Sequence, residues 1–89
     1  MMRSRSINAL RVYPNPAKNS ISLEGYFPTA ARTKIIISDM NGNQKLQKDI
    51  LVTSGVIKLP VEVSTWSKGI YFITVTDGKT NSRYSFIKE

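Results

Sequence analysis

Short runs of alternating apolar and polar residues follow one another along this chain, separated by glycine, proline, asparagine or aspartate. Residues i and i+2 share a face in such a run, as Ile21 and Leu23 do, and this period of two predicts β-strands. Residues 26–32 are predicted to form a loop, because Gly25 is expected to end the second strand. The predicted strands cover residues 9–13, 20–24, 34–38, 46–50, 56–61, 70–76 and 83–88.

Seven short strands in a chain of 89 residues predict an all-β fold, an immunoglobulin-like antiparallel β-sandwich. Asn41-Gly42 is the strongest hairpin signal, since both residues tolerate the positive φ of a tight turn. Further turns are predicted at Ser54-Gly55, at Asp77-Gly78 and over residues 63–68, where Gly69 closes the turn.

Two strands carry further information about their place in the sandwich. Pro60 cannot donate a hydrogen bond to a neighbouring strand, so its strand is predicted to lie at an edge or to end there. Ile35, Ile36 and Ile37 place apolar residues on both faces of one strand. That strand is predicted either to be central and covered on both sides, or to present its outer face to a partner.

The composition excludes most kinds of active site. The chain has no histidine and no cysteine, which removes the usual general base, the thiol nucleophile and the closed zinc site. The six acidic residues are dispersed, and a calcium loop starting at Asp39 would have Gln44 and Ile50 where glycine and glutamate are required. We therefore expect no enzyme activity, no cofactor and no metal.

The formal net charge of +7 leaves two interpretations open, solvated strand faces or an anionic partner. The basic residues are scattered singly, apart from Arg3 and Arg5 in a leader or linker over residues 1–6, so we expect no nucleic-acid partner. No apolar run is long enough to span a bilayer, and no signal-peptide core is present. The chain is then either cytoplasmic or a piece of a longer exported protein.

Two features point to binding. Trp66, Tyr26 and Phe27 could form an exposed platform for a sugar, although aromatic residues also plug the open ends of small sandwiches. Pro14-Asn15-Pro16 makes a stiff corner after the first strand, because the two prolines fix φ on either side of one asparagine.

Four segments, in order, resemble the motifs of type IX (Por) secretion system C-terminal sorting domains, type A. The resemblance covers about residues 7–89. The segments are Val12 to Ala17 with Ile21 to Leu23, then Ile37 to Gly42, Val63 to Tyr71, and Phe86 to Lys88.

The resemblance implies a folded secretion signal that directs an attached N-terminal passenger to the outer-membrane secretion translocon. It also implies removal of the domain by a sortase-like protease, passage through the periplasm, and a passenger that is anchored at the cell surface or released. An immunoglobulin-like adhesin or carbohydrate-binding module is the alternative. The recognition residues that the resemblance implies are Pro14, Asn15, Pro16, Asp39, Gly42, Gly69, Tyr71, Tyr84, Phe86, Ile87 and Lys88.

We expect the surface around Tyr71 and residues 84–89 to be the recognition face, with Pro14 to Pro16 ordering the chain near the cleavage linker. If the last strand is peripheral, its unpaired backbone groups can recruit another strand, and Arg83 and Lys88 would favour an acidic partner.

Overall fold

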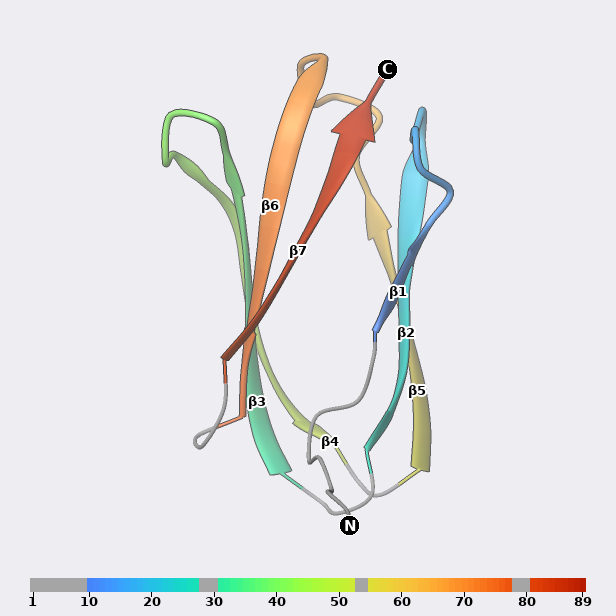
Figure 1. Ribbon diagram of the computed structural model, residues 1–89, viewed down its shortest axis with the longest axis vertical. Helices are drawn as coiled ribbons and strands as arrows, with labels where there is room; N and C mark the ends of the chain where they lie inside the picture. The colour runs from blue at the N-terminus through green and yellow to red at the C-terminus, as the bar shows by residue number, and fades with distance from the viewer. Residues whose placement is uncertain (1–9, 28–30, 53–54, 78–80) are drawn as a thin grey trace, which may run out of the picture.

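The computed structural model describes residues 10–27, 31–52, 55–77 and 81–89, and these residues form a β-sandwich (Figure 1). Within these ranges the chain has no helix long and apolar enough to cross a membrane. The strands are β1 (Arg11–Tyr13), β2 (Ser20–Phe27), β3 (Ala31–Asp39), β4 (Gln44–Val52), β5 (Gly55–Glu62), β6 (Gly69–Thr76) and β7 (Asn81–Lys88).

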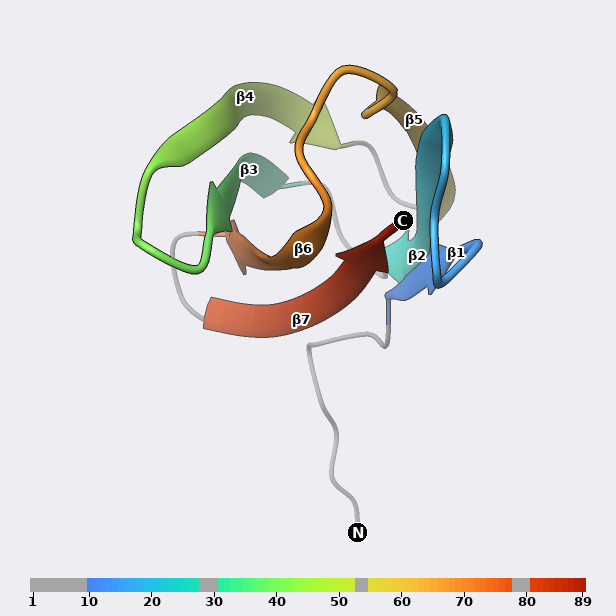
Figure 2. The same ribbon diagram turned by 90° about the horizontal axis from the view of Figure 1, so that it is seen from above.

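The strands form two sheets, one of three strands in the order β1-β2-β5 and one of four in the order β4-β3-β6-β7. Every pair of neighbouring strands is antiparallel. Viewed from above, the two sheets curve around a shared interior, with β1 beside the end of β7 (Figure 2). The all-β fold class and the sandwich of seven strands predicted from the alternating pattern are therefore confirmed.

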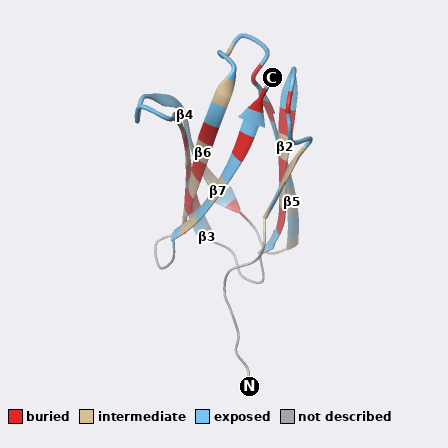
Figure 3. Cartoon of the chain, turned by 45° about the horizontal axis from the view of Figure 1, so that its top comes forward, coloured by how far each residue is buried: buried red, intermediate tan, exposed pale blue. Residues whose placement is uncertain are grey.

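Alternation along each strand explains where the core lies. Ile21 and Leu23 of β2 are each 1% exposed, and every second residue of β6 from Tyr71 to Val75 is also buried. The buried bands of both sheets face each other in Figure 3. Because the domain has no disulfide, this apolar interior is its main source of stability. The buried core residues are Ala17, Ile21, Leu23, Ile35, Ile37, Val61, Val63, Tyr71, Ile73, Val75 and Phe86.

The edge position predicted for the strand that holds Pro60 is confirmed, whereas the isoleucine strand is central in its sheet but is not fully covered on both faces. β3 lies between β4 and β6, with Ile35 and Ile37 buried and Ile36 half-buried on the outer face. β5 lies at the edge of its sheet, where Pro60 pairs with Ser22 of β2. Because Pro60 has no N–H and its strand has a neighbour on one side only, at most one hydrogen bond between β2 and β5 is lost there.

The predicted loop over residues 26–32 is too long, because β2 runs on to Phe27 and β3 begins at Ala31, and residues 28–30 lie outside the described residues. Gly25 does not end β2, since it is buried and paired with Ile57 of β5. Parts of the other predictions lie outside the described residues: the leader over residues 1–6, Ala9 at the start of the first strand, Ser54 and Gly78.

Candidate recognition site

Three turns and the end of β7 meet at one end of the sandwich, the upper end in Figure 1. The turns are residues 14–19, 40–43 and 63–68, which connect β1 to β2, β3 to β4 and β5 to β6. The backbone joins the first and third turns, since the N–H of Val63 donates to the carbonyl of Asn19 at 2.8 Å, and residues of the second and third turns line one hollow. The segments that resemble sorting motifs therefore converge in space, although they are spread over the whole sequence.

The corner after β1 is bonded to the end of β7, and we call this contact the C-terminal clasp, formed by residues 15–17 and 87–89. The N–H of Ala17 donates to the carbonyl of Ile87 at 2.7 Å, and the N–H of Glu89 donates to the carbonyl of Ala17 at 2.7 Å. The side-chain oxygen Oδ1 of Asn15 accepts a hydrogen bond of 2.9 Å from the N–H of Ile87. The clasp contains a parallel β-bridge between Ala17 and Lys88, which gives the end of β7 a backbone partner on its outer edge.

Residues 14–17 of the corner differ in burial according to their place in the clasp. Ala17 is fully buried, while Pro14, Asn15 and Pro16 are exposed, and the peptide bonds before both prolines are cis. We expected the corner to order the entrance of the chain, but its contacts are with the end of β7. The entering chain is bonded elsewhere, because the N–H of Leu10 donates to the hydroxyl of Tyr84 at 3.2 Å.

Asp39 organises the turn between β3 and β4. Its carboxylate accepts hydrogen bonds from the N–H of Asn41 and the N–H of Asn43, both at 2.9 Å, and from the side-chain amide of Asn43 at 3.1 Å. The N–H bond from Asn43 is the main reason that the pKa of Asp39 lies below its ordinary value. The predicted hairpin is confirmed, but only Gly42 has a positive φ, of 88°. Asp39 and Gly42 therefore shape a turn of four residues.

Three aromatic rings pack against one another beneath the upper end. Tyr71 lies between Trp66 and Phe86, with ring centroids 5.2 and 5.5 Å away. Its hydroxyl donates to the carbonyl of Ser67 at 2.6 Å, which ties β6 to the preceding turn. Burial raises the pKa of Tyr71 above its ordinary value, and the nearby charge of Asp39 adds to this effect.

The position of Trp66 bears on the sugar platform. Trp66 is half-buried and packs against the core, whereas Tyr26 lies on β2 opposite Val56, at the lower end of the sandwich. The two rings therefore form no common platform. Trp66 instead plugs the upper end, as aromatic residues do in small sandwiches. The side chain of Phe27 lies outside the described part of the structure.

An exposed apolar patch lies on the outer face of the upper end, and we call it the upper patch, formed by Met40, Ile70 and Ile87. Their side chains are 65%, 40% and 47% exposed. Ile70 and Ile87 are direct partners in the pairing of β6 with β7. Met40 and Ile70 line one shallow hollow of about 270 Å³. Sequence reasoning missed Met40 and Ile70, although the alternation that buries Tyr71 already placed Ile70 on the outer face.

The predicted recognition residues differ in how far they are exposed. Tyr71, Phe86 and Lys88 are only 3%, 1% and 7% exposed, so they can contribute to recognition only by shaping the surface above them. The ammonium of Lys88 donates to the carbonyl of Glu89 at 2.8 Å, where it supports the clasp. Tyr84 is half-buried on β7, where it pairs with Ile73 of β6. Those exposed or partly exposed at the upper end are Pro14, Asn15, Pro16, Asp39, Gly42, Gly69 and Ile87.

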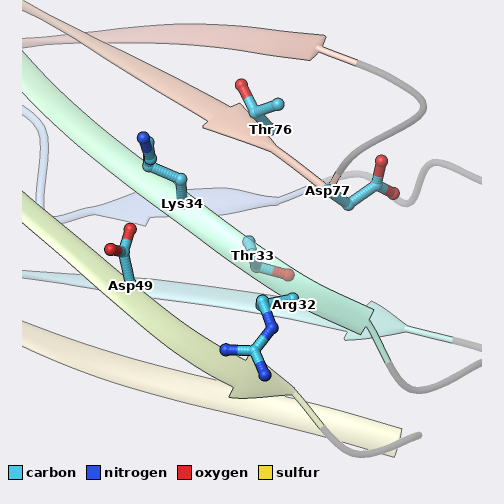
Figure 4. Close-up of a pocket in the computed structure, with 6 residues that line it drawn as sticks. All are labelled: Arg32, Thr33, Lys34, Asp49, Thr76 and Asp77. Carbon is cyan, nitrogen blue, oxygen red and sulfur yellow. The ribbon is translucent and has the colours of Figure 1, made fainter.

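A second hollow, of about 620 Å³, lies at the lower end of the four-stranded sheet (Figure 4). It is lined by two cations, Arg32 and Lys34, and by the carboxylates of Asp49 and Asp77. These charges offset one another and favour neither an anion nor a cation. The described residues contain no group of histidine, cysteine, aspartate or glutamate that could hold a metal ion.

Comparison with known proteins assigns the domain. The family model of the secretion system C-terminal sorting domain matches residues 11–89, which is nearly the whole chain and all seven strands. No curated protein matches the sequence. The match fits the arrangement of the upper end, where the motif segments converge. The chain belongs to the family of C-terminal sorting domains of the Por (type IX) secretion system, and it is a non-catalytic signal that targets a protein for secretion.

Proposed function

We propose that the secretion machinery recognises this domain at its upper end, through the upper patch and the clasp. The convergence of the motif segments at this end is the observation that carries the proposal. The patch offers exposed apolar surface, and the clasp fixes Ile87 beside Ile70 in a single arrangement. A folded surface of this kind can dock without paying the entropy of ordering a flexible tail.

The partner at this surface is the outer-membrane translocon, which receives the domain from the periplasm. A sortase-like protease then removes the domain on its N-terminal side, and the passenger is anchored at the cell surface or released. The sorting family implies an exported protein and an interaction with the type IX machinery.

The test is the export of a passenger fused upstream of the domain in a host that has a type IX system. Ile87→Ser and Met40→Ser remove apolar surface without touching the core, since both side chains are about half or more exposed. We expect each variant to reduce the passenger at the cell surface by about tenfold, the equivalent of about 1.4 kcal/mol of binding. The passenger should accumulate in the periplasm instead.

The lower end offers matched controls. Leu51 and Val56 are 65% and 69% exposed, so Leu51→Ser and Val56→Ser make the same chemical change away from the patch. We expect export of these two variants to stay near the wild-type level. Equal losses of export at both ends, in variants of unchanged thermal stability, would show that the upper patch is not the recognition surface.

A further inference from the structure

The two sheets have four edge strands, and three of them are protected against pairing with another chain. β1 has only three residues, and β5 contains Pro60. β4 is protected by Lys48, which pairs with the buried Ile35 and so lies on the inner side of the strand, yet is exposed. An inward-pointing charge at an edge is a recognised obstacle to strand addition.

β7 is the fourth edge strand, and the clasp covers only its end. The N–H and carbonyl of Ile87 point away from β6, toward Asn15 and Ala17. Backbone groups alternate along an antiparallel strand, so those of Ser85 and Arg83 also point away from β6. No strand in the described part of the chain pairs with them, and the stretch Asn81 to Ser85 has no proline, lysine or bulge.

We propose that residues 81–85 are a docking edge for an extended, acidic segment of a partner protein, which adds as a fifth strand to the four-stranded sheet. Only a polypeptide backbone supplies donors and acceptors at the spacing of this edge, which favours a protein partner over a lipid. This inference deepens the proposed function and rests on it for the identity of the partner, a component of the secretion machinery.

Charge selects the chemistry of the partner. Arg83 is exposed on the outer face, with its guanidinium carbon 5.3 Å from the ring centroid of Phe72, and an added strand would lie directly beside it. A second copy of this chain, paired antiparallel about Arg83, would bring two arginines together in a protein that already carries a net charge of +7. An acidic residue opposite Arg83 would instead be stabilised.

The edge can be blocked without breaking the sheet. Ser85→Pro removes an N–H that points away from β6 and leaves the β6–β7 ladder intact, which edge strands tolerate. Ser85→Ala keeps this N–H and is the matched control. The probe is a short peptide in which glutamate alternates with valine, added to the isotope-labelled full chain while amide exchange is followed by NMR.

We expect the glutamate peptide to slow exchange of the Arg83 and Ser85 amides by about threefold or more in wild type, and of the Arg83 amide likewise in Ser85→Ala. The Arg83 amide should keep its free rate in Ser85→Pro. A peptide with lysine in place of glutamate should have no effect on wild type but should protect Arg83→Glu. Equal protection by both peptides, protection that survives Ser85→Pro, or sedimentation of the free chain as a dimer would overturn the proposal.

Export of the passenger fusion provides the second readout. We expect Ser85→Pro to lower surface display by about tenfold relative to Ser85→Ala, with an unchanged melting temperature. Equal export of the two variants would show that the edge is not used. If the Met40 and Ile87 variants export normally while Ser85→Pro does not, the proposed function at the upper patch fails and the docking edge stands.

Discussion

The clasp makes a prediction about Asn15 that can be worked out from one hydrogen bond. Asn15→Ala removes the acceptor of the Ile87 N–H, which lies 2.9 Å from Oδ1. A neutral hydrogen bond contributes about 0.5–1.5 kcal/mol net to the free energy of unfolding. Ile87 is 47% exposed, so water can replace the lost partner, and we expect the lower half of that range, about 0.5–1 kcal/mol.

Two measurements check this value. With a urea m-value of about 1 kcal/mol/M for a domain of this size, the unfolding midpoint should fall by about 0.5–1 M. The remaining clasp bonds should also open more often, so exchange of the Ala17 and Glu89 amides should rise by about twofold to fivefold. Exchange reports the clasp directly, whereas the midpoint reports the whole domain.

Two further variants separate the hydrogen bond from the general effect of replacing an exposed asparagine. Asn15→Asp keeps an acceptor in place and should lose clearly less stability than Asn15→Ala. Asn41→Ala removes a side chain of the same kind, for which the described residues offer no hydrogen bond, since Asn41 bonds to Asp39 through its backbone N–H. An Asn15→Ala protein with the midpoint of Asn41→Ala and wild-type exchange at Ala17 would refute the reasoning.

Three other changes test the core and the upper turns. Phe86→Ala removes a ring that is 1% exposed and stacks on Tyr71, and should cost about 3–5 kcal/mol, measured by urea unfolding; a cost under about 1 kcal/mol would contradict its place in the core. Gly42→Ala should cost about 1–2 kcal/mol, because φ there is 88° although no atom lies in the way of a new Cβ, and equal thermal stability would count against this turn geometry. The pKa of Asp39 is lowered by folding, so the stability that its ionisation provides is present above the ordinary value of 3.8 and is lost as the pH falls below it. Unfolding followed against pH should therefore show a smaller acid loss in Asp39→Asn than in wild type, and parallel curves would refute the role of its hydrogen bonds.

The strands and their buried faces were predictable because each depends on neighbours in sequence. Ile21 and Leu23, or Tyr71 and Ile73, lie on one face by alternation alone, and the structure buries both pairs. The end of the second strand was predicted too early, because the propensity of Gly25 to end a strand is weaker than its pairing with Ile57. Pairing between strands that are distant in sequence is a tertiary effect that local patterns do not contain.

The recognition site was predictable only in part. The resemblance located the corner and the end of β7, but not their contact, because Asn15 and Ile87 are 72 positions apart. The burial of Lys88 was missed, although it shares the inner face of β7 with Phe86, two residues earlier. A basic residue is usually assigned to solvent, and here the alternation of the strand decides its position.

The clasp and the stack under it also bear on when this domain can fold during synthesis. β7 supplies Phe86 to the core and Ile87 to the clasp, and it pairs with β6 along its whole length. The β1 corner must therefore wait for a partner that is synthesised more than 70 residues later, a closure of high sequence separation that is intrinsically slow. A nascent chain holding only residues 1–80 lacks β7, so it cannot complete the four-stranded sheet or the clasp, and the finished sandwich forms only after translation has passed residue 88.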